Sequence, residues 1–152
     1  MTQQATDPFV WNGEKYVFNG ADSVYSLFDP EAFGLHPGMV TTACHKGFII
    51  FFSVKDDQLF IDQLDVYCPD ENYPVINGIE AKPGGIMGMR RYENLNIPRD
   101  YTGTVVISKT MKDRFKGRAF TGPHSYQENW DLDFEHGRLV SYRNTTGKYS
   151  GF

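Results

Sequence analysis

Residues 41–66 contain two apolar arms on either side of one short polar turn, Lys55-Asp56-Asp57-Gln58. The lengths of the arms are typical of strands, so the sequence predicts a long β-hairpin. With Asp56 and Asp57 as a two-residue loop, one face of the sheet pairs Val54 with Leu59 and Phe52 with Ile61. The other face then carries a mixed set, namely Phe51, Ser53, Phe60 and Asp62. A lone hairpin is at best marginally stable, so this one must pack on another layer.

Further strand signals recur along the chain. Residues 9–11 and 14–18 flank Asn12-Gly13, a strong hairpin signal because both turn residues tolerate positive φ. Residues 130–134 alternate apolar and polar side chains before the turn His136-Gly137 and the returning segment 139–142. The β-branched run 101–108 adds another strand. We expect a mainly β fold, an antiparallel meander that forms a sandwich or partly closed barrel with at most one or two short helices.

The length and composition indicate a single β-rich domain over residues 1–152, with 144–152 as a loose tail. Of the 152 residues, 40% are hydrophobic and 22% are charged, a globular balance. The one region with helical signals is 23–34, where Ser23 and Asp29-Pro30 suit helix starts and Gly34 suits a stop. Residues 69–98 are rich in Pro, Gly, Asn and Met, which predicts a long excursion, either an ordered loop or a mobile lid. Residues 86–89 of this excursion are expected to lie against the core.

Three stretches resemble segments of a family of small uncharacterised bacterial proteins. Residues 42–48, Thr-Ala-Cys-His-Lys-Gly-Phe, and the hairpin after them are similar to a segment that reads Cys-x-Arg-Gly-Tyr, then Trp-x-Ile and a turn into Leu-Tyr-Leu. Residues 95–98 with Tyr101-Thr102-Gly103 resemble the family's Pro-then-aromatic-x-Gly strand entry. Residues 132–139 resemble its closing Leu-x-Phe-x-x-Gly-x-Leu hairpin. The chain departs from the pattern at Lys46, Phe48 and Phe52, where the family has Arg, Tyr and Trp. The resemblance implies a β-rich fold and brings no established activity.

A thiol-dependent enzyme is the alternative function that the residues suggest. In the hairpin register above, positions 45 and 68 lie opposite each other, so His45 and Cys68 would be neighbours of the kind that generates a thiolate. The plainer interpretation, which we favour, is that Cys68 is a small buried hydrophobe and His45 a surface residue. A bulge at Gly47 would shift the register and separate the pair. Cys44 and Cys68 are placed on opposite faces, which predicts no disulfide between them.

Other chemistries have weak support in the sequence. The spacing of Cys and His matches no metal motif, so we expect no metal site and no cofactor. Asp131 and Asp133 share a strand face about 7 Å apart, a spacing found in inverting glycosidases, but polar-out alternation explains the same pattern. The glycine-rich run 84–88 lacks the Lys-Ser/Thr ending of a phosphate loop. The basic residues of 109–118 suit a solvated strand edge, and the net charge of −4 argues against nucleic acid as a partner.

Aromatic residues are unusually frequent, at 15% of the chain. They either fill the core or line a cavity or interface. The candidate binding residues are Phe51, Phe60, Tyr67, Tyr101, Tyr126 and Trp130. We therefore predict a non-enzymatic binding or interaction module that recognises a protein partner or a small apolar ligand through an aromatic-lined sheet face. A homo-oligomer is a further possibility.

The sequence also bears on location. The N-terminal residues lack the basic and apolar regions of a signal peptide, and no apolar run has the length of a membrane span. We expect a cytoplasmic protein with two reduced cysteines and no membrane partner.

Overall fold

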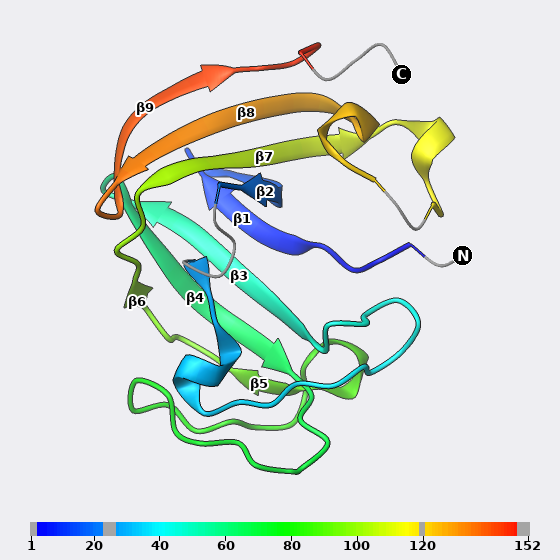
Figure 1. The fold of residues 1–152 in the computed structure, drawn as a ribbon, viewed down its shortest axis with the longest axis vertical. Helices are drawn as coiled ribbons and strands as arrows, with labels where there is room; N and C mark the ends of the chain where they lie inside the picture. Colours follow the sequence, from blue (N-terminus) through cyan, green and yellow to red (C-terminus); the bar gives the residue numbers. More distant parts are fainter. Residues whose placement is uncertain (1–2, 23–26, 119–120, 149–152) are drawn as a thin grey trace.

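A computed structural model describes residues 3–22, 27–118 and 121–148. Within them, nine strands form one mixed sheet that curls into a partly closed ring (Figure 1). The strands are β1 (Asp7–Trp11), β2 (Glu14–Ala21), β3 (Phe48–Lys55), β4 (Gln58–Val66), β5 (Arg90–Tyr92), β6 (Ile97–Pro98), β7 (Gly103–Met111), β8 (Tyr126–Glu135) and β9 (Arg138–Asn144). The helical elements are short 3-10 turns, η1 (Pro30–Phe33), η2 (Ile86–Gly88), η3 (Asp113–Phe115) and η4 (Pro123–Ser125). The predicted fold class is confirmed.

The hairpin predicted from residues 41–66 forms as β3 and β4. Lys55 pairs with Gln58, and the turn residues Asp56 and Asp57 have φ values of 50° and 61°. Phe52 lies opposite Ile61, as expected. At the next residue of β3 the register shifts. Phe51 pairs with Gln63, which leaves Asp62 unpaired as a bulge in β4. Beyond this bulge every pairing of the hairpin differs by one residue from the predicted register.

Two further hairpins also form where the sequence placed them. β1 and β2 join at Asn12-Gly13, and β8 and β9 join at His136-Gly137, with positive φ at all four residues. One connection differs from an all-antiparallel meander. β1 pairs in parallel with β3, through Phe9 with Phe52 and Val10 with Ser53. The first hairpin is thereby fixed against the second, and Phe9 and Phe52 come together inside the ring.

The ring runs in the order β3-β1-β2-β7-β8-β9-β4 and returns through the β3–β4 pairing. The weakest junction lies between β9 and β4, where the paired residues are Gln58 and Arg138. The amide of Leu139 also donates to the carbonyl of Asp57 over 2.7 Å. β5 and β6 pair with β4 outside this circuit. The ring is therefore closed on this side by a short contact between the β3–β4 and β8–β9 turns.

The main core fills the ring. Its buried side chains come from most strands and include Phe9, Phe52, Leu59, Ile61, Tyr101, Val105, Ile107, Leu132 and Phe134. A second, small cluster of Cys44, Ile49 and Met89 lies apart from it, with Phe51 and Tyr67 packed against it. Cys68 belongs to the main core and Cys44 to the second cluster, and both are free thiols.

The segment between β2 and β3 carries the predicted helical turn in part. Asp29 caps η1 by accepting a hydrogen bond from the amide of Glu31, and Gly34 ends it in the left-handed region. The first predicted helical stretch, from Ser23, falls largely on residues outside the described ranges. In Figure 1 the described segment that leads into η1 crosses in front of the β3–β4 hairpin at β4. The ring of Phe28 contacts that of Phe48 at 5.4 Å between centroids, which confirms the proximity.

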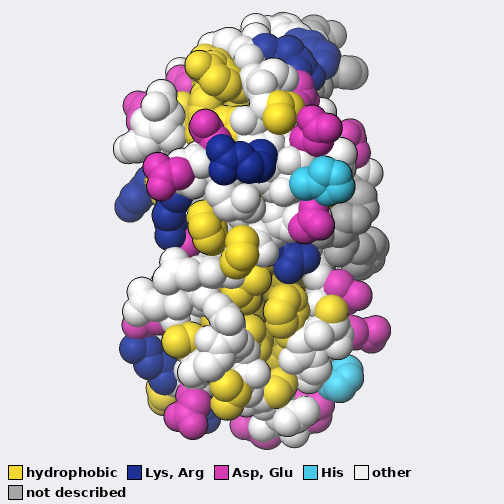
Figure 2. Space-filling view, turned by 90° about the vertical axis from the view of Figure 1, so that its left-hand side faces the viewer, with side chains coloured by type: hydrophobic (Ala, Val, Ile, Leu, Met, Phe, Trp, Pro, Cys, Tyr) yellow, Lys and Arg dark blue, Asp and Glu magenta, His cyan; other side chains and the backbone are white. Residues whose placement is uncertain are grey.

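The excursion over residues 69–98 packs on the sheet. Asp65 of β4 is fully buried and accepts a bidentate pair from Arg91 at 2.8 and 2.9 Å and a hydrogen bond from the amide of Ile86. Met89 is buried, whereas Ile86 and Met87 are exposed, so residues 86–89 contact the core through Met89. Figure 2 shows the side of the molecule that lies to the left in Figure 1. Apolar side chains gather in the lower half of this face, where the loops between β4 and β5 lie, and charged side chains are mixed over the upper half.

The segment predicted as a loose tail is anchored over its described part. The amide of Thr145 donates to the carbonyl of Asn129, and the hydroxyl of Thr146 accepts from the amide of Asn129. Thr145 is buried. Residues up to 148 thus extend the contacts between β9 and β8, while 149–152 lie outside the described residues.

Candidate functional site

A cavity of about 510 Å³ opens between β3 and the segment that leads into η1. Its walls are almost entirely apolar. Among the described residues they are lined by Phe18, Leu27, Phe28, Pro30, Phe48, Ile50 and Phe52, with Asp7 and Lys46 as the charged members. Ligand pockets typically have volumes of about 300–1,000 Å³ and apolar walls with a few polar groups. The size and lining of this cavity therefore suit a small organic molecule.

Contacts between phenylalanine rings hold the walls. Phe18 and Phe52 lie 5.5 Å apart between ring centroids, and Phe9 supports Phe52 from the core at 5.8 Å. Phe28 stacks on Phe33 at 5.5 Å and also contacts Phe48. Ring pairs at these separations are favourable beyond the area that they bury. The rings are therefore fixed before any ligand arrives.

The polar part of the cavity is an ion pair. Lys46 Nζ lies 2.6 Å from Asp7 Oδ2, and the ammonium also lies 4.8 Å from the centre of the Phe48 ring. The other oxygen of Asp7 accepts the amide hydrogen of Ile50 over 2.9 Å. The Asp7 side chain is only 10% exposed, whereas that of Lys46 is 39% exposed. The carboxylate is thus part of the wall, and the ammonium lies nearer the solvent.

Simple strand periodicity explains how these residues reach the cavity. Phe48, Ile50 and Phe52 alternate along β3 and so share one face of the sheet. On β1 the same alternation places Asp7 on the buried side together with Phe9. Gly47 sets the approach to β3: its φ is +79°, and a Cβ there would lie 2.1 Å from the carbonyl oxygen of Gly38. The close passage of these two backbones fixes Lys46 beside Asp7.

The six aromatic residues predicted to bind do not form one site. Phe51 and Tyr67 pack against the second cluster, and Phe60 lies beneath the ammonium of Lys55 at 5.1 Å from the ring centre. Tyr101 and Tyr126 are buried, at 1% and 7% exposure. The sixth residue, Trp130, belongs to another aromatic group.

That group joins β1, β8 and β9. The ring of Trp11 contacts those of Trp130 and Tyr142 at 5.1 and 5.2 Å between centroids. The indole nitrogen of Trp130 donates to Glu128 over 2.8 Å. Tyr142 is 59% exposed, although its neighbours in the group are largely covered. The exposed ring of Tyr142 is therefore a second feature of the surface.

The proposed pair of His45 and Cys68 does not form, and the register prediction that joined them is wrong. The bulge at Asp62 moves the pairing by one residue, and β3 begins only at Phe48. His45 is exposed, and its amide donates to Gln4 Oε1, whereas Cys68 is fully buried. Burial also raises the pKa of the Cys68 thiol, the opposite of what an activated nucleophile needs.

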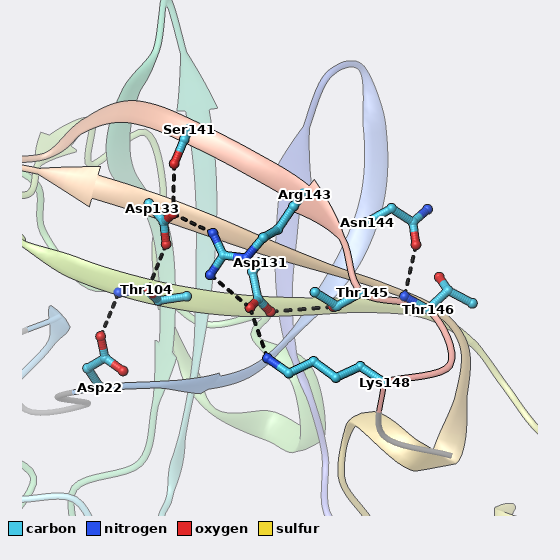
Figure 3. Close-up of polar contacts among 10 residues, drawn as sticks. All are labelled: Asp22, Thr104, Asp131, Asp133, Ser141, Arg143, Asn144, Thr145, Thr146 and Lys148. Carbon is cyan, nitrogen blue, oxygen red and sulfur yellow. Dashed lines mark hydrogen bonds and ion pairs between the residues drawn. The ribbon is translucent and has the colours of Figure 1, made fainter. Parts of the chain in front are cut away.

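Asp131 and Asp133 belong to a polar network on the outer side of β7, β8 and β9 (Figure 3). Arg143 bridges them, contacting Asp131 Oδ2 at 3.2 Å and Asp133 Oδ2 at 2.5 Å. Asp133 also accepts hydrogen bonds from the hydroxyls of Thr104 and Ser141. The expectation that both carboxylates are solvated is wrong for Asp131, whose side chain is 4% exposed because the 144–148 segment covers it; Lys148 Nζ lies 3.7 Å away.

This network does not suit glycoside hydrolysis. The hydroxyl of Thr104, together with Ser141 and Arg143, lowers the pKa of Asp133 to about 2. A general acid needs a raised pKa. The side chains of Asp131 and Asp133 are instead joined by one guanidinium, which leaves no gap for an attacking water. Within the described residues, no three His, Cys, Asp or Glu side chains are grouped to hold a metal ion.

The cavity residues were missed at the sequence level, apart from the assignment of Phe52 to a core face. One signal was present. In the alternating stretch of β1, the charged Asp7 occupies the same face as Phe9 and Trp11. A charge on a buried face requires a partner or a function. The partner, Lys46, lies 39 residues away and could not be identified from local pattern.

Comparisons with models of protein families, with curated proteins and with solved structures find no match. Among the described residues, no helix is both long and apolar enough to cross a membrane. The function of the chain therefore has to follow from its own geometry.

Proposed function

We propose that this protein binds a small apolar ligand in the cavity beside β3 and that it catalyses no reaction on it. The observation that carries the proposal is the apolar enclosure of about 510 Å³, with rings from Phe18, Phe28, Phe48 and Phe52. Burying apolar ligand surface at about 25 cal/mol per Å² gives such a site its affinity. This site differs from the predicted sheet face, since it uses the opposite side of β3.

The non-enzymatic part of the proposal rests on the chemistry of the alternatives. Cys68 has a raised pKa and no neighbouring histidine on the strand opposite. Asp133 has a lowered pKa and is neutralised by Arg143. Two buried free thiols also agree with a reducing compartment, and we propose the cytoplasm. The net charge of −4 supports partners other than nucleic acid.

A titration with the neutral fluorescent probe N-phenyl-naphthylamine tests the proposal. The native chain should bind one probe molecule saturably. Ile50→Phe places extra volume inside the cavity and should weaken binding at least tenfold, and Leu27→Phe should do the same if the first variant is poorly folded. Val140→Phe adds a ring to a residue that is 58% exposed and does not line the cavity, so it serves as the matched control. No saturable binding, or equal binding by all variants, overturns the proposal.

A second candidate is self-association through β9. One side of β9 pairs with β8. On the other side, within the described residues, the strand residue that pairs with β9 is Gln58 of β4. The amide of Thr145 donates to the carbonyl of Asn129, so the backbone groups of Thr145 face β8. Because the direction of these groups alternates along a strand, the N–H and C=O groups of Tyr142 and Asn144 face the open edge of β9. Open edges readily pair with another chain. β9 also exposes two large apolar side chains, Val140 at 58% and Tyr142 at 59%.

The sequence of β9 suits pairing with a second copy. An antiparallel copy centred on Ser141 places Val140 opposite the partner's Tyr142, an aromatic–aliphatic pair of the favourable kind. Arg138 is already paired with Gln58 of β4, and the same register sets Leu139 opposite the partner's Arg143, so no like charges face each other. The short edge offers a small interface, which favours a weak dimer.

Sedimentation velocity from micromolar to millimolar concentration tests this second candidate. The native chain should form dimers at the upper end. Val140→Lys with Tyr142→Lys should keep it monomeric, whereas Val10→Lys, on an exposed position of β1, should not. A native chain that is monomeric throughout, or a dimer that survives the double substitution, would rule β9 out.

A further inference from the structure

The ion pair between Asp7 and Lys46 allows the ligand class to be narrowed, on the premise that the cavity binds a ligand at all. These two side chains are charged, and the other described residues of the lining are apolar. Among the described side chains that line the cavity, this pair is what can satisfy a polar group that a ligand carries in. The hydrogen-bonding capacity that the pair has left therefore selects the ligand.

Asp7 has acceptor capacity left over. An ionised carboxylate offers about four lone-pair positions. One is taken by the amide of Ile50, at 2.9 Å, and one by Lys46, at 2.6 Å. The carboxylate is held in place from two directions, and its side chain is 90% buried against the cavity wall.

Lys46 has donor capacity left over. Its ammonium carries three N–H groups, and among the described residues its hydrogen-bond acceptor is Asp7. The ammonium also lies over the ring of Phe48, which itself lines the cavity. A donor and an acceptor thus sit side by side on the same wall.

The net charge of the pair disfavours an ionised ligand. An anionic head would gain Lys46 but face Asp7 at close range, and a cationic head would gain Asp7 but face Lys46. Each would also lose its hydration, which is costly for a charge that is not fully paired. Asp29 and Glu31 line the adjoining surface depression together with Lys46, which makes an anion less favourable still.

We infer that the cavity takes a neutral apolar alcohol. Its hydroxyl accepts a hydrogen bond from Lys46 Nζ and donates one to a carboxylate oxygen of Asp7, while its hydrocarbon part lies among the phenylalanine rings. A hydroxyl is both donor and acceptor, so it satisfies both members of the pair without separating them. At about 30 Å³ for each water-sized group, the share of one water molecule in the liquid, the cavity holds on the order of fifteen non-hydrogen atoms.

A series of four probes, each with ten or eleven carbon atoms, tests the inference, each displacing N-phenyl-naphthylamine at pH 7. Decanol should bind at least tenfold more tightly than decanoate or decylamine. Decyl methyl ether accepts a hydrogen bond but donates none, and it should bind about fivefold more weakly than decanol. The ether controls for hydrophobicity, because it is no less apolar than the alcohol.

Two substitutions sharpen the test. Asp7→Asn removes the negative member, so decanoate should gain on decanol by at least fivefold. Lys46→Met removes the positive member, so decylamine should gain instead. Circular dichroism confirms that each variant is folded, and Lys55→Met, at an ion pair outside the cavity, should leave the order of affinities unchanged.

The outcomes separate the two levels of the account. If decanoate or decylamine binds the native chain most tightly, or if the ether binds as tightly as decanol, the inference of an alcohol ligand is wrong. The proposal that the cavity binds a ligand then still stands. An order of affinities that neither Asp7→Asn nor Lys46→Met alters also overturns the inference of an alcohol ligand. If no probe of the series binds and N-phenyl-naphthylamine itself does not, the proposed function fails.

Discussion

Lys46 donates a hydrogen bond to Asp7 over 2.6 Å although 39 positions separate them in the chain. The contact fastens the approach to β3 against the first residue of β1, beside the parallel pairing of these strands. It places a neutral pair of charges in an apolar wall. The contact is therefore both a structural tie and the polar feature of the cavity.

Breaking this pair from one side should be costly. Lys46→Met leaves a largely buried carboxylate without its cation, and we expect a loss of about 1–3 kcal/mol in the free energy of unfolding. Adding Asp7→Asn to Lys46→Met should recover part of the loss. Urea denaturation of the four chains of the double-mutant cycle measures the coupling. Lys55→Met, whose partner Asp62 is more exposed, should cost less than about 1 kcal/mol, and an equal cost would contradict the burial assigned to Asp7.

Gly47 should tolerate no side chain. Gly47→Ala adds a Cβ that collides with the carbonyl of Gly38 and holds alanine at a positive φ, so we expect a loss of more than about 2 kcal/mol. Gly13→Ala is the matched control, since its φ is +75° but nothing lies within 4 Å of the added Cβ. It should cost about 1 kcal/mol. Thermal unfolding of the two variants compares them, and similar costs would speak against the close passage at Gly38.

Asp133 should contribute to acid unfolding. Its pKa is lowered to about 2 in the folded chain by Thr104, Ser141 and Arg143, so it adds stability that is complete above the unfolded value near 4. That stability disappears as the pH falls toward 2. Because the side chain is partly exposed, we expect Asp133→Asn to cost only about 1 kcal/mol at pH 7 and to flatten the pH dependence between 4 and 2. Denaturation at a series of pH values measures this, with Asp57→Asn in the exposed β3–β4 turn as control; the same slope in both variants would count against the network.

The cysteines should be inert in the folded chain. Cys44 and Cys68 are 2% and 0% exposed, and burial raises the pKa of the Cys68 thiol. We expect alkylation by iodoacetamide to proceed at pH 7 only as fast as the chain opens, and two thiols to react after denaturation without reductant. Mass spectrometry counts the labels. Rapid labelling of Cys68 in the folded chain would revive the thiol-dependent alternative.

Local turn chemistry explains which parts of the fold were predictable. Asn12-Gly13, Asp56-Asp57 and His136-Gly137 each tolerate positive φ, and each forms the hairpin turn that the sequence indicates. The predicted β3–β4 register is correct near the Asp56-Asp57 turn, because these two residues form the two-residue loop from which it was derived. It failed beyond Asp62, because a bulge depends on what the strand meets on both sides rather than on the turn.

Long-range contacts explain what was not predictable. The parallel pairing of Phe9 with Phe52 joins segments more than forty residues apart, and no local pattern encodes it. That pairing turns Phe52 toward Phe18 and creates the cavity. The predicted binding aromatics, by contrast, were chosen by residue type alone, and the fold distributes them between the core, a small cluster and the outer surface.

The cavity is tested most directly by nuclear magnetic resonance of the labelled chain during a titration with decanol. The account predicts saturable shifts at the methyl groups of Leu27 and Ile50 and the ring of Phe48, which line the cavity, and none at Val140 on β9. Shifts confined to Val140 and Tyr142, or the absence of any saturable change at the cavity residues, would contradict it.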